Sequence, residues 1–465
     1  MLFLLILPLL FCLPAFAVTL KVVRPEPAEA LAISEGRTFV IGTVDPADSS
    51  VTCNGVKCDV SEDGAFIGFV PIRRTDEMVE EREKKCDAMF HFVARSGEDE
   101  TSKDVPTYTP KSPSAAEPPE KIFDPPRWIR LVKNQFIGLE GERLGEIWCA
   151  PKGAVMKSAR ANQSSYRCKV HSDIEVGILK SDFEEIENGS SSEDRSEGFV
   201  IRADVKSIAV QGAKGVEVTS AGSIHYEDGA FQGVYRGFKV RFDKGLVKLD
   251  ERVRGKGRPF SDDPDKPLKD LRVCLDPGHH PDSGAVGPRG LEERISNLLI
   301  ARQTAKLLEA EGAKVCFSRE ENPLPLKQRH DRMRELNPDL VVSIHNNSVG
   351  DGQDPRERHG TQTFWLFPWS KPLAESVHKA MLKHLETTDM GCIRRNLYIP
   401  RFPDCPTILI EPEYIILPNQ EKKFMDAEYR EKLAGAIVEG IRNFILYAAG
   451  SDKGLSEAPE QGKKE

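Results

Sequence analysis

From residue 271 onward, short apolar runs alternate with stretches of helical spacing, and this alternation constrains the fold more than any other feature. The runs cover residues 271–279, 340–345 and 407–411, and turn-forming residues bound them. Short apolar runs of this kind are typical of buried strands in a parallel sheet, and the helical stretches would connect such strands. Residues 271–448 therefore predict an α/β domain with a largely parallel sheet flanked by helices.

Each of these runs ends at a side chain that can carry chemistry, namely His279, His345 or Glu411. Glu293 lies apart, in a Gly-rich stretch where a helix is expected to begin. In open α/β sheets, ligands bind beyond the carboxyl ends of the strands, so the four side chains are predicted to meet at one edge. Two imidazoles, one carboxylate and an open position form a catalytic zinc set, and a further carboxylate can act as general base.

Three nearby residues compete for these roles. His280 adjoins one predicted ligand, Glu292 adjoins another, and Glu413 follows the predicted base by two positions. His345 also has a purely structural interpretation, as a hydrogen-bonded core histidine at a strand end. Asp276 is predicted to cap the turn or to orient a ligand. Residue type and position alone leave these alternatives open.

The chain before residue 256 contains short β-like runs separated by Asn-Gly and Asp-Gly turns, which predict all-β modules ahead of the α/β domain. The block after the prolines loosely resembles a bacterial SH3-like module. A length of 465 residues is also too great for one ordinary core. The predicted segments are an Ig-like β-sandwich at 18–110, a Pro-rich linker at 111–126, a small SH3-like module at 127–187, a β module at 198–256, a linker at 257–270 and a disordered tail at 449–465.

Residues 1–17 form an apolar stretch that ends in Ala-Phe-Ala, the pattern of a cleavable secretory signal peptide. The stretch is short for a membrane span, which needs about 20 residues. An uncleaved membrane anchor is the alternative. No second apolar segment approaches spanning length, so we expect export to the periplasm, the cell envelope or the medium, with no transmembrane segment after signal removal.

Three ordered motifs carry a family resemblance. The run VCLDPGHHPDSGAVGPRGLEER, at 273–294, resembles the opening of the zinc-dependent N-acetylmuramoyl-L-alanine amidases, known as amidase type 3. NPDLVVSIHNN, at 337–347, and PTILIEPEYIILPNQEKKF, at 406–424, resemble later segments of the same family. Several motifs in the same order over about 180 residues make a more specific signal than one alone. The resemblance covers the whole predicted α/β domain.

The resemblance implies a role for each residue that matches a motif. The family's zinc ligands fall on His279, Glu293 and His345, and its catalytic glutamate falls on Glu411. Separately from the resemblance, Arg394 or its neighbour Arg395, and Asn346, are predicted to contact the substrate, and a solvated surface role is the alternative for the arginines. Arginine suits this role because it binds carboxylates in a bidentate manner.

The implied activity is hydrolysis of the amide between N-acetylmuramic acid and the L-alanine of the stem peptide in peptidoglycan. The β modules would position the enzyme on the wall, on a wall-anchored partner or on a protein activator. A net charge of −8 argues against nucleic acid as a partner, because nucleic-acid-binding surfaces are usually basic. Two alternatives are a zinc hydrolase of another amide and an inactive protein that binds or regulates the wall.

Overall fold

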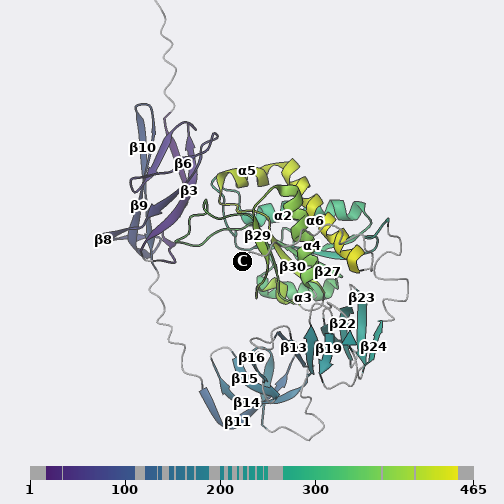
Figure 1. Ribbon diagram of the computed structural model, residues 1–465. Helices are drawn as coiled ribbons and strands as arrows, with labels where there is room; N and C mark the ends of the chain where they lie inside the picture. The colour runs from purple at the N-terminus through teal and green to yellow at the C-terminus, as the bar shows by residue number, and fades with distance from the viewer. Residues whose placement is uncertain are drawn as a thin grey trace, which may run out of the picture.

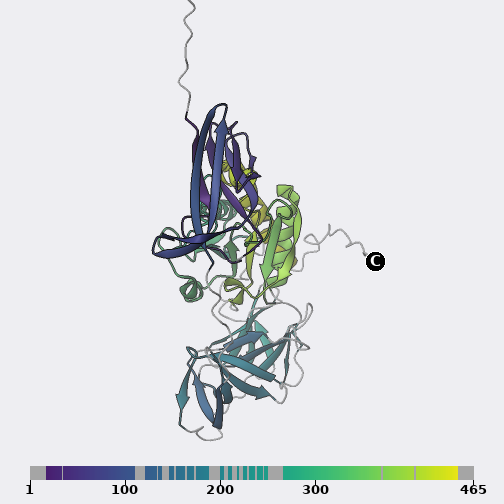
Figure 2. The same ribbon diagram turned by 90° about the vertical axis from the view of Figure 1, so that its left-hand side faces the viewer.

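The computed structural model describes residues 17–109 except 34, parts of 121–249, and 265–448 except 368–369 and 403–404. The predicted signal peptide, apart from residue 17, and the predicted tail lie outside these ranges. A β module that starts the chain lies beside an α/β domain that ends it, and further strands lie on another side of that domain (Figures 1 and 2). Within the described ranges, no helix is both long and apolar enough to cross a membrane.

The first β module consists of two sheets that share one apolar core. Val40 and Val70 of the first sheet pack in the same cluster as Phe90 and Phe92 of the second. The predicted all-β architecture is therefore confirmed here. The first sheet has the order β1 (Thr19–Arg24), β3 (Arg37–Asp45), β7 (Ala65–Pro71), β6 (Asp59–Val60), and the second has the order β2 (Glu29–Ala30), β10 (Asp99–Tyr108), β9 (Lys84–Ser96), β4 (Ser50–Cys53), β5 (Val56–Lys57), with β8 (Arg73–Glu81) also paired to β9.

The strands between 121 and 249 form three antiparallel sheets. The first has the order β16 (Ile174–Leu179), β15 (Ser165–His171), β14 (Val155–Ala161), β11 (Lys121–Leu131), β17 (Phe183–Ile186). The second has the order β12 (Gln135–Gly138), β13 (Glu146–Ala150), β18 (Phe199–Ala203), β19 (Ile208–Gln211), β20 (Glu217–Val218). The third has the order β21 (Ile224–Glu227), β22 (Ala230–Tyr235), β23 (Phe238–Asp243), β24 (Leu246–Leu249).

These sheets correct two predicted boundaries. β13 pairs with β18, so the predicted modules 127–187 and 198–256 share a sheet and are not independent units. Strand β11 begins at Lys121, inside the predicted Pro-rich linker. Its register shifts between Ile122 and Arg127, and this irregularity accommodates Pro125 and Pro126, which lack the N–H group that a regular ladder needs.

The α/β domain contains one six-stranded sheet covered on both faces, and it confirms the predicted fold class of this region. The first four strands in the sheet order are parallel, whereas β28 runs antiparallel to β30 and parallel to β29. The order is β26 (Lys314–Phe317), β25 (Arg272–Pro277), β27 (Leu340–Ile344), β30 (Thr407–Glu411), β28 (Thr361–Trp365), β29 (Asp389–Arg394), and the helices are α2 (Glu293–Ala310), α3 (Leu326–Leu336), α4 (Lys371–Leu385), α5 (Pro418–Met425), α6 (Ala427–Ala448) and the 3-10 turn η3 (Ile399–Arg401).

Alternate strand residues divide the core of this domain into two layers. Val273 and Val342 pack in the cluster that contains the buried faces of α2, α4 and α6. Cys274 and Val341, each one position away, pack with Met333 of α3 on the other face. This alternation follows from the two-residue period of a strand, and it explains why the runs are apolar throughout.

The first β module packs against the α/β domain through its first sheet. Phe39, Ile41 and Ile67 belong to the same buried cluster as the core of the α/β domain. Val40, between two of them, points into the sandwich instead. Figure 1 shows β3 on the side of the module that faces the α/β domain. The first β module and the α/β domain therefore share a continuous apolar core.

Asp351 of the α/β domain is the centre of the polar contact with this module. Its carboxylate accepts hydrogen bonds from Arg24 Nη2 at 2.7 Å, Thr38 Oγ1 at 2.6 Å and the Ala32 backbone N–H at 2.6 Å. The side chain of Asp351 is only 3% exposed, so these bonds are shielded from water. Two further ion pairs cross the same boundary, Arg289–Asp63 and Arg356–Asp59, each at 2.5 Å.

We expect Asp351→Ala to lower the free energy of unfolding by about 1–3 kcal/mol, because it leaves the buried Thr38 hydroxyl and the partly buried Arg24 guanidinium without this acceptor. Denaturant unfolding of the two proteins measures this loss. Glu357→Ala is the matched control, since Glu357 is an exposed acid on the same loop. Equal stability of the Asp351 variant and the control would contradict a stabilising contact between the two parts.

Candidate metal centre

The sheet brings two of the predicted ligands to one edge. Pro277 at the end of β25 is in register with Ile344 at the end of β27, which is in register with Ile410 of β30. Backbone hydrogen bonds continue one residue beyond these strand ends. Gly278 N–H donates to Ile344 O at 2.8 Å, and His345 N–H donates to Ile410 O at 3.0 Å. The residues that follow the strands are therefore held side by side, as the sequence pattern predicts.

His279, Glu293 and His345 form a compact cluster at this edge. The Glu293 carboxylate lies between the two imidazoles, with Oε2 3.0 Å from His279 Nε2 and Oε1 3.0 Å from His345 Nδ1. The three ligand atoms lie within 4.8 Å of one another. In the described part of the chain, no other group of three or more His, Cys, Asp or Glu residues meets this criterion. Two imidazole nitrogens and one carboxylate oxygen suit zinc.

Glu293 begins helix α2 and is held by its neighbours as an ionised carboxylate. It accepts hydrogen bonds from the backbone N–H groups of Ala285 at 2.9 Å and Asn346 at 3.1 Å. Burial by itself would raise the pKa of Glu293, but hydrogen bonds from His279 and His345 outweigh burial and hold that pKa well below its usual range. The charged form is the one that a metal ion requires.

Two glycines allow the backbone to approach these side chains. A Cβ atom on Gly278 would lie 2.2 Å from Cε1 of the His345 ring. A Cβ atom on Gly284 would lie 2.6 Å from Glu293 Oε2, and its φ of +65° also favours glycine. The loops around the cluster are thus shaped around the imidazole and carboxylate groups.

The structure places two of the competing residues outside the cluster. His280 Nε2 lies 2.7 Å from Glu321 O, and its ring Nδ1 lies 3.3 Å from the Arg294 guanidinium. Glu292 forms a short ion pair with the same arginine. Both side chains are therefore engaged on the other side of the loop. This geometry favours His279 and Glu293 as the ligands.

Glu411 ends strand β30 and carries a buried oxygen, Oε2, with no hydrogen-bond partner among the described residues. Burial raises the pKa of Glu411 well above its usual range, and the negative charge of Glu293 raises it further. Glu413 faces different neighbours, with its carboxylate 3.9 Å from His359 Nδ1. Oε2 of Glu413 is also buried without a hydrogen-bond partner among the described residues, so the feature that distinguishes Glu411 is its electrostatic interaction with Glu293.

A buried ion pair under the cluster fixes the loop that carries His279. Asp276 is fully buried and accepts hydrogen bonds from Arg329 Nη1 at 3.0 Å and Ser343 Oγ at 2.6 Å. Arg329 also donates to the backbone carbonyls of Pro277, at 3.0 Å, and His279. An orienting role was predicted for Asp276, and these bonds agree with it. No role was predicted for Arg329, because its pairing with Asp276, 53 positions away, leaves no local pattern in the sequence.

We expect Arg329→Met to lower the free energy of unfolding by about 3–5 kcal/mol, because it leaves the buried Asp276 carboxylate without its positively charged partner. Zinc affinity should fall about 10–100-fold, since the loop of a ligand loses its support. Competition with a chromogenic chelator measures the affinity. Arg332→Met, on the same helix but 47% exposed, is the matched control. Unchanged zinc affinity in the folded Arg329 variant would contradict this positioning role.

Arg394 and Asn346, the two residues predicted to contact substrate, are not part of the His279, Glu293 and His345 cluster. Arg394 is in register with Trp365, which is in register with Ile408 near the start of β30. It therefore lies towards the opposite end of the sheet from the cluster, and its predicted substrate contact stays a prediction that this register does not favour. Asn346 is 1% exposed and donates from Nδ2 to Ser296 and Asn297 of α2. Its contact with substrate stays a prediction, and its bonds show a structural role.

Comparison with known proteins locates the same region. A family model described as N-acetylmuramoyl-L-alanine amidase matches residues 273–443. The chain is 31% identical over 183 residues to the probable cell wall amidase LytH of Staphylococcus saprophyticus, covering 39% of this chain and 60% of LytH. It is 31% identical over 185 residues to the uncharacterized protein YqiI of Bacillus subtilis, covering 38% of this chain and 87% of YqiI.

Among solved structures, the amidase AmiC2 of Nostoc punctiforme is 30% identical, with 38% of this chain and 97% of AmiC2 covered and a TM-score of 0.35. The family model falls on the α/β domain, and each of the other matches covers 38–39% of this chain. The chain spans only 60% of the LytH length, and the β modules lie outside the matched family region.

Proposed function

Because the chain belongs to the N-acetylmuramoyl-L-alanine amidase family, we propose that its α/β domain hydrolyses the amide between N-acetylmuramic acid and L-alanine in peptidoglycan. The observation that carries this proposal is the cluster of His279, Glu293 and His345 next to the unpartnered Glu411. All four residues lie within the matched segment 273–443. The substrate is thus the glycan strand with its stem peptide.

Zinc is the metal that these donors fit. His279 Nε2, His345 Nδ1 and one Glu293 oxygen would hold the ion, and three protein ligands leave a coordination position open. Asp282 supports this arrangement, because its carboxylate lies 2.5 Å from His279 Nδ1. That contact places the ring proton on Nδ1 and leaves Nε2 free to ligate. When bound, zinc polarises the scissile carbonyl and favours ionisation of water.

Glu411 acts in this proposal as the proton carrier. Its carboxylate takes one proton from the attacking water while the water oxygen bonds to the lactyl carbonyl carbon. It then gives that proton to the nitrogen of L-alanine as the carbon–nitrogen bond breaks. Burial raises the pKa of Glu411, which makes the protonated form a more accessible intermediate state between the two transfers. The products are a free lactyl carboxyl group and a stem peptide with a new amino terminus.

The rest of the chain is proposed to place this domain at the cell wall. We assign the first module, with its two facing sheets, to the Ig-like sandwiches and the sheet of β16, β15, β14, β11 and β17 to a small SH3-like unit. Residues 1–17 would direct export to the periplasm or envelope. A protein partner or activator would then bind through the β modules.

The amino terminus exposed by digestion tests the proposed bond. Purified peptidoglycan is digested with the protein, and new α-amino groups are derivatised and identified. Alanine is the expected residue. A different amino-terminal residue would assign the enzyme to another amide. No new amino terminus, with tight retention on the wall, would support the alternative of an inactive wall-binding protein.

A further inference from the structure

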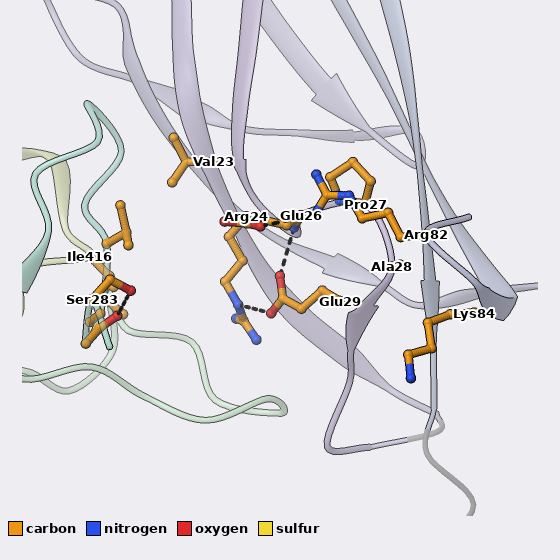
Figure 3. A pocket seen from close by; sticks show the side chains of 13 residues that line it. Val23, Arg24, Glu26, Pro27, Ala28, Glu29, Arg82, Lys84, Ser283 and Ile416 are labelled. Carbon is orange, nitrogen blue, oxygen red and sulfur yellow. Dashed lines mark hydrogen bonds and ion pairs between the residues drawn. The ribbon is translucent and has the colours of Figure 1, made fainter. Parts of the chain in front are cut away.

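A cleft of about 490 Å³ lies between the first β module and the α/β domain. Figure 3 shows Arg24, Glu29 and Lys84 of the module on one side and Ser283 and Ile416 of the α/β domain on the other. The cleft exists only because the two parts are docked. Its walls are fixed by the contact around Asp351 described above.

One side of this cleft is formed by a loop that also contacts the metal cluster. Ser283, Gly284 and Ala285 line the cleft. Ala285 N–H donates to Glu293 Oε2 at 2.9 Å, and a Cβ atom on Gly284 would lie 2.6 Å from both Glu293 Oε2 and Cδ2 of the His279 ring. One short loop therefore separates the cleft from the metal ligands, and none of these ligands lines the cleft. A substrate that reacts at the cluster can extend over this loop towards the module.

The cleft carries charges of both signs, and most of them are already matched. Arg24 is paired with Glu29 at 2.9 Å and with Asp351 at 2.7 Å. Arg82, in the β8–β9 turn, lies 3.6 Å from Glu26, and both of these side chains are at least 60% exposed. A pair that is this long and this exposed is weak.

Lys84, at the start of β9, is the strongest candidate for a ligand contact. Its Nζ lies 5.8 Å from the centre of the Tyr108 ring, and the side chain is exposed. No ion pair of Lys84 occurs among the described residues, so its ammonium group is available. An ammonium and a loosely held guanidinium on one wall select for an anionic group.

We propose that this cleft is a subsite for the stem peptide, in which Lys84 and Arg82 bind a free carboxylate. The proposal rests on the proposed amidase function, because that function supplies the substrate. Stem peptides carry several carboxylates beyond the L-alanine whose bond is cut. The 283–286 loop lies between the cleft and the cluster, and an extended peptide of four or five residues spans roughly 13–18 Å. The first module would then contribute to specificity for the peptide and not only to attachment.

The test compares the Arg82→Ala/Lys84→Ala double variant with Lys85→Ala as matched control. Lys85 is an exposed lysine next in the same strand, so its side chain points to the opposite face. Binding of the soluble tripeptide L-alanyl-γ-D-glutamyl-L-lysine, and of its form with both carboxyl groups amidated, is measured by calorimetry with the full chain. Hydrolysis of peptidoglycan fragments by the same proteins gives kcat and KM separately.

We expect the double variant to bind the free-acid tripeptide about tenfold more weakly than wild type and to raise KM by a similar factor, with kcat unchanged. Lys85→Ala should match wild type, and amidation of the tripeptide should abolish the difference between variants. Equal affinity of wild type and double variant, or no binding to wild type, would overturn the subsite. Binding that depends on Lys84 without any hydrolysis would keep the subsite and overturn the proposed activity.

Discussion

Glu411→Gln is expected to reduce kcat by about 10²–10⁴-fold while zinc stays bound. The amide keeps the shape of the side chain but removes the group that accepts the proton of water. Glu411 makes no ligand contact in the cluster of His279, Glu293 and His345, so the metal site should remain intact. Release of stem peptides, measured together with zinc content by atomic emission, separates the two effects.

Glu413→Gln is the matched comparison for this result. Glu413 is also a buried glutamate, two positions further along the same segment, and its carboxylate faces His359 instead of the cluster. We expect it to retain most of its activity. Full activity of the Glu411 variant, with loss of activity in the Glu413 variant, would transfer the role of general base to Glu413.

His279→Ala is expected to remove turnover almost completely, with zinc affinity reduced by more than about 100-fold. The loss should exceed the 10–100-fold that follows from removing a residue that only supports a ligand. A two-ligand site would no longer hold the ion at the position from which it polarises the carbonyl. Equilibrium dialysis against buffered zinc measures the affinity, and peptide release measures turnover.

The adjacent residue supplies the control, because His280 has the same chemistry and nearly the same place in sequence. Its ring contacts Glu321 O and the Arg294 side chain, not the cluster. We expect His280→Ala to bind zinc like wild type. Loss of zinc in the His280 variant, with normal zinc in the His279 variant, would show that the assignment of these neighbours is reversed.

The sequence predicted the α/β domain and its cluster well because both depend on local patterns. Apolar runs report buried parallel strands, and a polar residue at the end of such a run must lie at the carboxyl edge of the sheet. His345 and Glu411 were found in this way. The choice of His279 over His280 needed either the family resemblance or the observed ring contacts, because both residues follow the same strand.

The sequence was least informative where strand direction or long-range pairing decides the arrangement. Arg394 was predicted at the site, but β28 reverses direction and carries β29 with it, so the end of β29 lies far from the end of β30. β13 pairs with β18, so the predicted modules 127–187 and 198–256 share a sheet, although a polar stretch lies between them in the sequence. The contact between Arg24 and Asp351 joins residues 327 positions apart, and no local pattern marks such a contact.

The most direct test of the central claim is one digestion of purified peptidoglycan, analysed by mass spectrometry, with metal-free protein before and after zinc is restored. Release of stem peptides that begin with L-alanine only after zinc addition is the predicted result. The same release by metal-free protein, or release of fragments cut at a different bond after zinc addition, would contradict a zinc-dependent N-acetylmuramoyl-L-alanine amidase at the cluster of His279, Glu293 and His345.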